Sequence, residues 1–207
     1  MRFGDACGWV NLRGKMAIHK LDTEERALLL KIARQAIENA VNKIPLPELD
    51  LSKMPQLLQE QGASFVTLTI GNGLRGCIGT LQAIQPLALD VQEHAVAAAL
   101  DDYRFPPVSP AEVGSLTIEI SCLTPSQPLE FQDGSDLAHK LRPGIDGVVL
   151  RRGAQRATFL PQVWESLPQP EDFLSRLCLK MGAPPDIWKH EKLQVEIYQV
   201  EEFKETH

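Results

Sequence analysis

The sequence of 207 residues lacks several features that would indicate a specialised class of protein. No stretch approaches eighteen consecutive apolar residues, and the first fifteen residues lack the continuous apolar segment of a secretory signal. The four cysteines are far apart, so no pair has the C-x-x-C spacing typical of zinc and redox sites. We therefore expect a cytoplasmic protein with reduced thiols, and no membrane segment, metal site or cofactor of its own.

Basic residues are also outnumbered, because 21 Lys and Arg stand against 27 Asp and Glu, a formal net charge of −6. This balance argues against a protein whose whole surface binds a phosphate backbone, although it leaves room for a local basic patch. The hydrophobic share of 43% and the charged share of 23% are typical of globular proteins. The length suffices for one good-sized domain or two small lobes around a hydrophobic core.

Residues 1–15 show neither helical nor strand periodicity, and a second methionine, Met16, stands just before the first regular pattern. We interpret 1–15 as a leader, disordered or surplus to the native protein. The remaining residues, 16–207, are interpreted as a single domain of two intertwined lobes.

The first regular pattern is an amphipathic helix predicted from Asp22 to Asn42, where apolar residues recur at helical spacing. Asp22 and Glu25 have the spacing of an N-cap and its N3 partner, which marks the start of this helix. Two prolines, Pro45 and Pro47, mark its end.

The rest of the chain repeats one order of predicted elements. In the first half, a hairpin of two strands, a helix and a further strand are expected at residues 65–70, 74–81, 86–100 and 116–122. In the second half, the same order is expected at residues 147–150, 156–160, 171–181 and 193–200. Because hairpins dominate over β-α-β crossovers, we predict an α+β fold of mainly antiparallel sheet, with two tightly packed lobes of β-β-α-β order.

A glycine motif at residues 71–76 matches the G-x-G-x-x-G pattern of dinucleotide-binding proteins. That pattern requires a helix directly after the glycines, but Cys77, Ile78, Gly79 and Thr80 are poor helix formers. A kinase glycine loop does lie in a hairpin, yet the chain contains no V-A-I-K, H-R-D or D-F-G motif. Both nucleotide-binding interpretations are therefore rejected.

As a strand, the same stretch places Arg75, Cys77 and Gly79 on one face. A guanidinium beside a thiol favours the thiolate, and the small glycines let a ligand approach the backbone, so this face suits a nucleophile or an anion-binding site. The competing interpretation is that Cys77 is a small buried hydrophobic residue and that the glycines mark a bulge. Glu119, on the polar face of the strand at 116–122, is a candidate general base or a partner for an arginine, with plain solvent exposure as the alternative.

Other reactive residues are interpreted more simply. Cys122 and Cys178 lie on apolar stripes and are expected in the core, and His94 is expected on an exposed helix face. A basic hairpin resembles a nucleic-acid site, but no aromatic residue interleaves with its arginines, so we expect a solvated surface there. Its members are Lys140, Arg142, Arg151, Arg152 and Arg156.

Four motifs together resemble the AMMECR domain family, which in bacteria and archaea is associated with the AmmeMemoRadiSam system. They are LRGCIGT at 74–80, RFPPV at 104–108, DGV at 146–148 and FLPQV at 159–163. The resemblance runs from about Leu21 to Phe203 and implies a cytosolic α+β fold of two packed lobes, with the Arg-Gly-Cys motif near a cleft between them. It also implies association with a Memo-type protein, similar to extradiol dioxygenases, and with a radical S-adenosylmethionine enzyme. The chain has no C-x-x-x-C-x-x-C motif, so any iron–sulfur chemistry would belong to a partner.

The resemblance raises the weight of Cys77 as a functional residue, because the thiol recurs within a family motif. The predicted catalytic residues are Cys77, Arg75 and Glu119, and the predicted ligand-binding residues are Gly76, Ile78, Gly79, Arg104, Asp146 and Gln162. Three functions remain open: an enzyme of a modification pathway that acts on a small anionic substrate or a modified nucleotide, a binding module that uses the same cleft without turnover, and an RNA-binding protein, ranked last.

Overall fold

The computed structural model describes residues 20–206, so the proposed leader at 1–15 lies outside the described residues. The helices are α1 (Thr23–Val41), α2 (Gln56–Gln59), α3 (Leu87–Leu100), α4 (Gly134–Lys140) and α5 (Pro170–Lys180). The strands are β1 (Gln61–Ile70), β2 (Gly73–Gly79), β3 (Gln85–Pro86), β4 (Leu116–Leu123), β5 (Gln127–Pro128), β6 (Gly147–Arg152), β7 (Gln155–Phe159), β8 (Gln194–Tyr198) and β9 (Val200–Lys204). Four short 3₁₀ turns lie at Leu51–Lys53, Val113–Ser115, Pro161–Glu165 and Ile187–Lys189.

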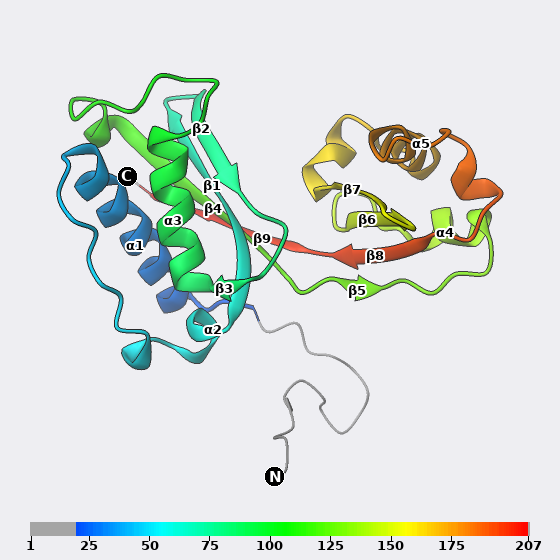
Figure 1. Ribbon diagram of the computed structural model, residues 1–207, viewed down its shortest axis with the longest axis horizontal. Helices are drawn as coiled ribbons and strands as arrows, with labels where there is room; N and C mark the ends of the chain where they lie inside the picture. Colours follow the sequence, from blue (N-terminus) through cyan, green and yellow to red (C-terminus); the bar gives the residue numbers. More distant parts are fainter. Residues whose placement is uncertain (1–19, 207) are drawn as a thin grey trace, which may run out of the picture.

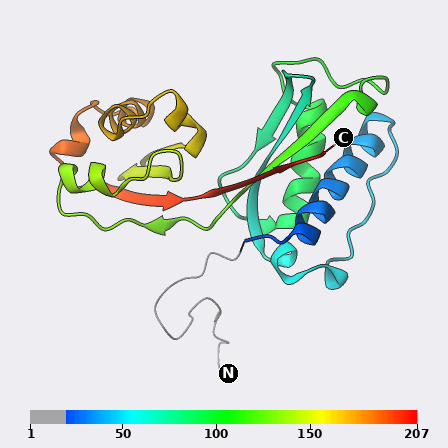
Figure 2. The ribbon, with the colours of Figure 1, turned by 180° about the vertical axis from the view of Figure 1, so that it is seen from behind.

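The first lobe is an antiparallel sheet of order β2-β1-β4-β9, to which the short β3 adds beside β1. Helices α1 and α3 cover one face of this sheet (Figure 1), while the view from behind shows its other face without a helix (Figure 2). Alternation along β1 sends Val66 and Leu68 into the core under the helices and leaves Thr67 half-buried on the helix-free face. The sheet therefore has one apolar face and one polar face.

Helix α1 begins at a complete capping box. Asp22 accepts the backbone N–H of Glu25 at 2.8 Å, and the Glu25 carboxylate accepts the backbone N–H of Asp22 at 2.9 Å. Two N–H groups that the helix itself leaves unpaired are satisfied in this way. The predicted helix start is therefore confirmed.

The second lobe is a smaller antiparallel sheet of order β5-β8-β6-β7, with α5 packed beside β7. Its core is separate from that of the first lobe and is centred on Phe173, whose ring stacks on Trp164 with centroids 3.7 Å apart. Each lobe therefore has its own hydrophobic core.

The lobes are joined by an antiparallel ribbon, which we define as residues 119–128 paired with residues 196–204. At its centre the N–H of Thr124 donates to the carbonyl of Gln199, and the N–H of Gln199 donates to the Thr124 hydroxyl. Each sheet thus gains one strand from the chain segment that has just left the other lobe. Strand β9 pairs with β4 in the first sheet, and β5 pairs with β8 in the second.

The predicted α+β class with antiparallel sheets is confirmed, and the repeated β-β-α-β order corresponds to one strand order, β2-β1-β4 in the first lobe and β7-β6-β8 in the second. Short elements escaped prediction, namely α2, β3, α4 and β5. They are too short to show a period. The strand predicted at 193–200 is two strands, β8 and β9, because the chain passes from one sheet to the other at Gln199.

Replacing the N-cap by Asp22→Ala should lower the free energy of unfolding by about 1 kcal/mol, because the Glu25 N–H loses its acceptor. Glu24→Ala, at an exposed first-turn position, is the control and should change it by less than about 0.5 kcal/mol. Urea unfolding of both variants measures this difference. Equal losses would contradict the capping role.

Candidate functional site

The glycines of the LRGCIGT motif are required by packing. Strand β2 lies at the edge of the first sheet, and a Cβ added at Gly76 would overlap the backbone carbonyl of Ala98 on α3. A Cβ added at Gly79 would overlap the carbonyl of Ser64 and the Phe65 side chain. Ile78 packs against the core of the first lobe. These three predicted ligand-binding residues therefore have contacts within the fold.

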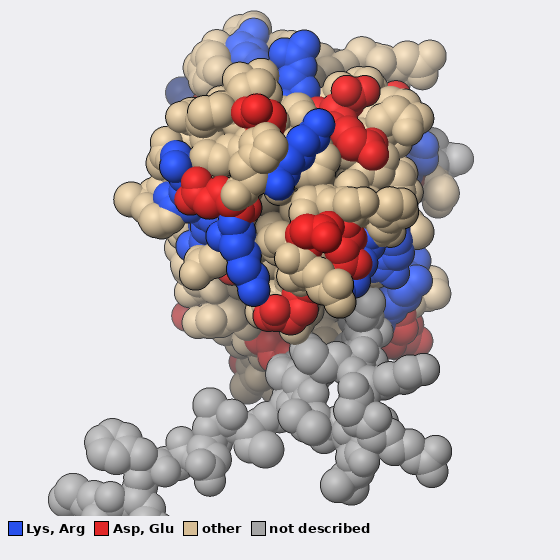
Figure 3. Space-filling view, turned by 90° about the vertical axis from the view of Figure 1, so that its right-hand side faces the viewer, with Lys and Arg blue, Asp and Glu red and all other residues tan. Residues whose placement is uncertain are grey.

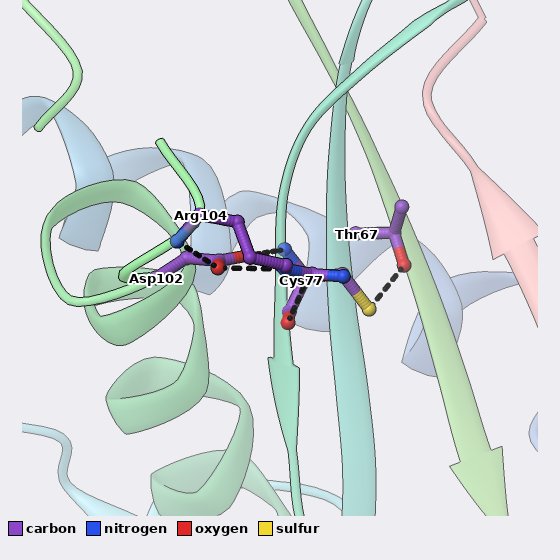
Figure 4. Close-up of polar contacts among 4 residues, drawn as sticks. All are labelled: Thr67, Cys77, Asp102 and Arg104. Atoms are coloured by element: carbon purple, nitrogen blue, oxygen red, sulfur yellow. Dashed lines mark hydrogen bonds and ion pairs between the residues drawn. The ribbon is translucent and has the colours of Figure 1, made fainter. Parts of the chain in front are cut away.

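Since Gly76 faces α3, alternation places Cys77 on the helix-free face of the sheet. The thiol is half-buried, and the hydroxyl of Thr67 on β1 donates to its Sγ at 3.3 Å. Figure 4 shows this contact on one side of Cys77 and two further residues, Asp102 and Arg104, on the other. The thiol therefore lies against a neutral hydroxyl.

Asp102 and Arg104 hold the backbone of Cys77 at the open edge of the strand. The Cys77 N–H donates to Asp102 Oδ2 at 2.8 Å, and Arg104 Nη2 donates to the Cys77 carbonyl at 3.1 Å (Figure 4). Arg104 also binds Asp102 through Nε, at 2.8 Å, and Nη2, at 2.6 Å. The Asp102 side chain is only 2% exposed, and its bond to Arg104 holds the pKa of that carboxyl well below its usual range. Arg104, expected to bind an anion, therefore already binds an internal carboxylate.

Arg75 is likewise engaged. It is the extra residue of a β-bulge between β1 and β2, so the simple alternation that placed it beside Cys77 is interrupted there. Its side chain is 12% exposed, and its guanidinium donates to both oxygens of Glu112, at 2.8 and 3.3 Å. This bond, with those from Ser109, lowers the pKa of Glu112 to about 2. The predicted pairing of a free guanidinium with the thiol is thus replaced by an ion pair with the loop after α3.

Glu119 lies on the same sheet face as Cys77 but not beside it. Both residues are register partners of Thr67, Cys77 on β2 and Glu119 on β4. Two strand spacings separate their Cα atoms by ~10 Å, which is beyond the reach of a direct hydrogen bond in this arrangement. On its other side Glu119 is paired in register with Lys204 of β9. The predicted general base is therefore not in contact with the predicted nucleophile.

The remaining predicted ligand-binding residues belong to the second lobe. Asp146 is fully buried and accepts three bonds from Arg142, through its backbone N–H, Nε and Nη2. Gln162 is exposed and donates to Glu202 on β9, which also accepts the hydroxyl of Ser121 at 3.3 Å. Asp146 thus fixes a turn, whereas Gln162 forms a polar contact between the lobes.

A cavity of about 470 Å³ lies where the two lobes meet the ribbon, and we call it the inter-lobe cavity. No residue of the LRGCIGT motif lines it, although Cys122 and Asp146 do. Its lining comes from both lobes: Leu21, Leu57, Glu60, Gln61, Gly62, Leu87, Cys122, Leu123, Thr124, Pro125, Gln127, Arg142, Asp146, Ile197, Tyr198, Gln199 and Glu201. The inter-lobe cavity is therefore formed mostly by residues outside the sequence motifs.

Two cysteines were expected in the core, and Cys122 and Cys178 are both buried. Burial raises the pKa of both thiols, which keeps them protonated at neutral pH. The core assignment is confirmed.

The prediction that His94 lies on an exposed helix face is wrong. Its side chain, on α3, is only 12% exposed. Its Nδ1 lies 3.2 Å from Asp90 Oδ2, which also accepts the Ser64 hydroxyl at 2.6 Å. Burial lowers the pKa of His94, but the hydrogen bond and charge of Asp90, with the charge of Glu93, outweigh it and raise the pKa overall. Since α3 covers the sheet face opposite Cys77, His94 is not placed to act on that thiol.

The basic hairpin of the second lobe is largely neutralised. Arg151 pairs with Glu196, Arg152 with Glu191, and Lys140 with Asp136. The end of the second lobe that points away from the first shows Lys and Arg interspersed with Asp and Glu (Figure 3). Because a nucleic-acid site needs uncompensated cations, this surface does not favour RNA.

Within residues 20–206, no group of three or more His, Cys, Asp or Glu side chains could hold a metal ion. Over the same residues, the structure contains no helix of the length and hydropathy that a bilayer crossing requires.

These features define a two-lobed α+β protein with two antiparallel sheets, a strand exchanged in each direction and a glycine-flanked Cys on an edge strand. A match to the family model AMMECR1 covers residues 30–203, so the chain belongs to the AMMECR1 family. The resemblance seen in the motifs is thereby confirmed.

Relatives extend over nearly the whole chain. A protein of Methanothermobacter thermautotrophicus is 37% identical over 193 residues, covering 89% of this chain and 96% of its own. One of Thermofilum pendens is 36% identical over 202 residues, covering 90% and 92%. The crystal structure of an uncharacterised protein from Pyrococcus horikoshii, 35% identical, has a TM-score of 0.73 and covers 87% of this chain and 91% of its own.

The sequence patterns did not identify three residues that contact the predicted site residues: Thr67, Asp102 and Glu112. Asp102 stands two positions before Arg104, and a carboxylate so close to a motif arginine was a local signal for their pairing. Thr67 and Glu112 gave no such signal, because strand register and the course of the loop after α3 bring them into contact.

Gly76→Ala should lower the free energy of unfolding by about 1–3 kcal/mol, because the new methyl group would overlap the Ala98 backbone and force α3 away from β2. Gly114→Ala is the control, since a Cβ there meets nothing within 4 Å, and it should cost less than about 0.5 kcal/mol. Denaturant unfolding measures both. A stable Gly76→Ala protein would show that this glycine is not needed for packing.

The raised pKa of His94 predicts a defined pH dependence of stability. The stabilisation from charged His94 is fully present below its unfolded pKa of 6.5 and is lost as the pH rises through the higher folded value. The stability advantage of the wild type over His94→Gln should therefore be constant below about pH 6.5 and shrink as the pH rises above that value. Urea unfolding on both sides of this pH tests it, and parallel stability curves would refute it.

Proposed function

We propose that the protein is a ligand-binding module and that its ligand occupies the inter-lobe cavity. The observation that carries this proposal is the cavity itself, about 470 Å³ in volume and lined from both lobes, largely by apolar side chains. Ligand sites of small molecules are typically concave, mostly apolar and within this range of volume. A site built from both lobes also allows a bound ligand to fix their relative position.

The alternative, an enzyme of a modification pathway that uses Cys77, has less support from the geometry. Both motif arginines bind carboxylates of the fold, Arg75 binding Glu112 and Arg104 binding Asp102. The candidate base Glu119 is two strands away from the thiol. A cysteine nucleophile needs a base or a cation to activate it, and neither predicted group is free at Cys77 to do so.

We further propose, on the family resemblance, that a Memo-type protein and a radical S-adenosylmethionine enzyme are the partners of this module. A cytoplasmic location fits such partners. Co-purification of the tagged chain from its own host tests the association.

Native mass spectrometry of the protein isolated from its own host should detect a small molecule bound in a 1:1 ratio. Filling the cavity with Gln127→Trp should reduce its occupancy at least about tenfold, because the indole takes the space of the ligand. Gln132→Trp, at an exposed position outside the lining, is the matched control and should retain the ligand.

The neutral fluorescent probe N-phenyl-1-naphthylamine gives a second measurement that needs no natural ligand. Its saturable binding should be lost in Gln127→Trp and kept in both Gln132→Trp and Cys77→Ser. Equal binding by Gln127→Trp and wild type would contradict the proposed site. Loss of binding in a folded Cys77→Ser protein would instead place the ligand site on the helix-free face of the sheet, at Cys77.

A further inference from the structure

Three glutamines distinguish the inter-lobe cavity from a plain hydrophobic pocket. Gln61 at the start of β1, Gln127 on β5 and Gln199 at the centre of the ribbon all line it. Their backbones pair with neighbouring strands and with Thr124, but within residues 20–206 their side-chain amides have no hydrogen-bond partner. Each amide offers both an acceptor oxygen and two N–H donors.

The charged groups of the lining are mostly cancelled within the fold. Arg142 is bound to Asp146, and Glu201 accepts both Arg26 and the backbone N–H of Leu21. Glu60 is the charged lining residue without an ion pair in the described part of the chain, and it carries negative charge. The cavity therefore offers no free cation to an anionic ligand.

The remaining wall is apolar, and it comes from both lobes. Leu57, Leu87 and Leu123 contribute from the first lobe, and Ile197 and Tyr198 from β8 of the second. The Tyr198 hydroxyl is already used, since it donates to the Phe159 carbonyl and bonds to Thr158. The ring therefore presents an apolar surface, which suits an uncharged body of about the volume of the cavity.

From these three features we infer that the cavity takes an uncharged molecule with an apolar body and amide-type groups, such as a lactam or a cyclic amide. This inference rests on the proposed function and names its ligand class. The glutamine amides pair with the N–H and C=O groups of the ligand, which would otherwise lose their hydrogen bonds on leaving water. The uncompensated Glu60 carboxylate disfavours an acid of the same size.

Displacement of N-phenyl-1-naphthylamine by three leucine compounds tests this inference on the full-length protein. Neutral cyclo(L-Leu-L-Leu) should displace the probe, whereas anionic N-acetyl-L-leucine should bind at least about tenfold more weakly. Cationic L-leucinamide should also bind at least about tenfold more weakly, because its ammonium group loses hydration in the mostly apolar cavity and the single Glu60 carboxylate offsets only part of that cost. Gln199→Met and Gln127→Met keep the side-chain length but remove the amide. Each should raise the Kd of cyclo(L-Leu-L-Leu) about three- to tenfold, the loss expected for one hydrogen bond.

The same variants should leave the Kd of N-phenyl-1-naphthylamine within about twofold, because this probe makes little use of amides. Gln132→Met is the matched control for cyclo(L-Leu-L-Leu) and should bind it as the wild type does. The inferred class is overturned, and the proposed function kept, if the probe binds in the cavity but the acid or the amine competes as well as the cyclic amide. Failure of the probe itself to bind the wild type would overturn the proposed function instead.

Discussion

The antiparallel ribbon of residues 119–128 and 196–204 supports the rest of the architecture, because each of its two chain segments passes from one sheet into the other. At Thr124 and Gln199, where the two segments pass between the sheets, two hydrogen bonds hold them together. Buried backbone polar groups must be paired, so neither lobe completes its sheet without the chain that leaves the other. The two lobes therefore form one architectural unit although their hydrophobic cores are separate.

The inter-lobe cavity follows from this connection. Two cores joined by a narrow ribbon leave space beside it, and the residues of the ribbon become the wall between the lobes. A ligand there contacts both lobes at once and would stabilise their relative position through binding alone. The proposed binding role and the exchanged strands thus have a common physical origin.

The family motifs have a different role from the one their chemistry suggested. Gly76 and Gly79 permit close approach of α3 and β1, and Asp102 with Arg104 satisfies the backbone of Cys77 at a sheet edge. An unprotected edge strand invites pairing with another chain, so a charged pair that covers it is a structural device in its own right. Cys77 itself is still accessible on the helix-free face, beside Thr67.

Periodicity and capping are local properties, and for this reason the sequence determined the helix from Asp22, the hairpins, the antiparallel class and the buried state of Cys122 and Cys178. It could not determine which carboxylate meets which arginine, because Glu112 reaches Arg75 from a separate loop. Neither could it place Glu119 two strands from Cys77, since that distance depends on strand order rather than on alternation. Gln61, Gln127 and Gln199 carry no motif at all. Only the tertiary structure brings them to one cavity, because the exchange of strands places the start of β1, strand β5 and the connection between β8 and β9 at the same junction.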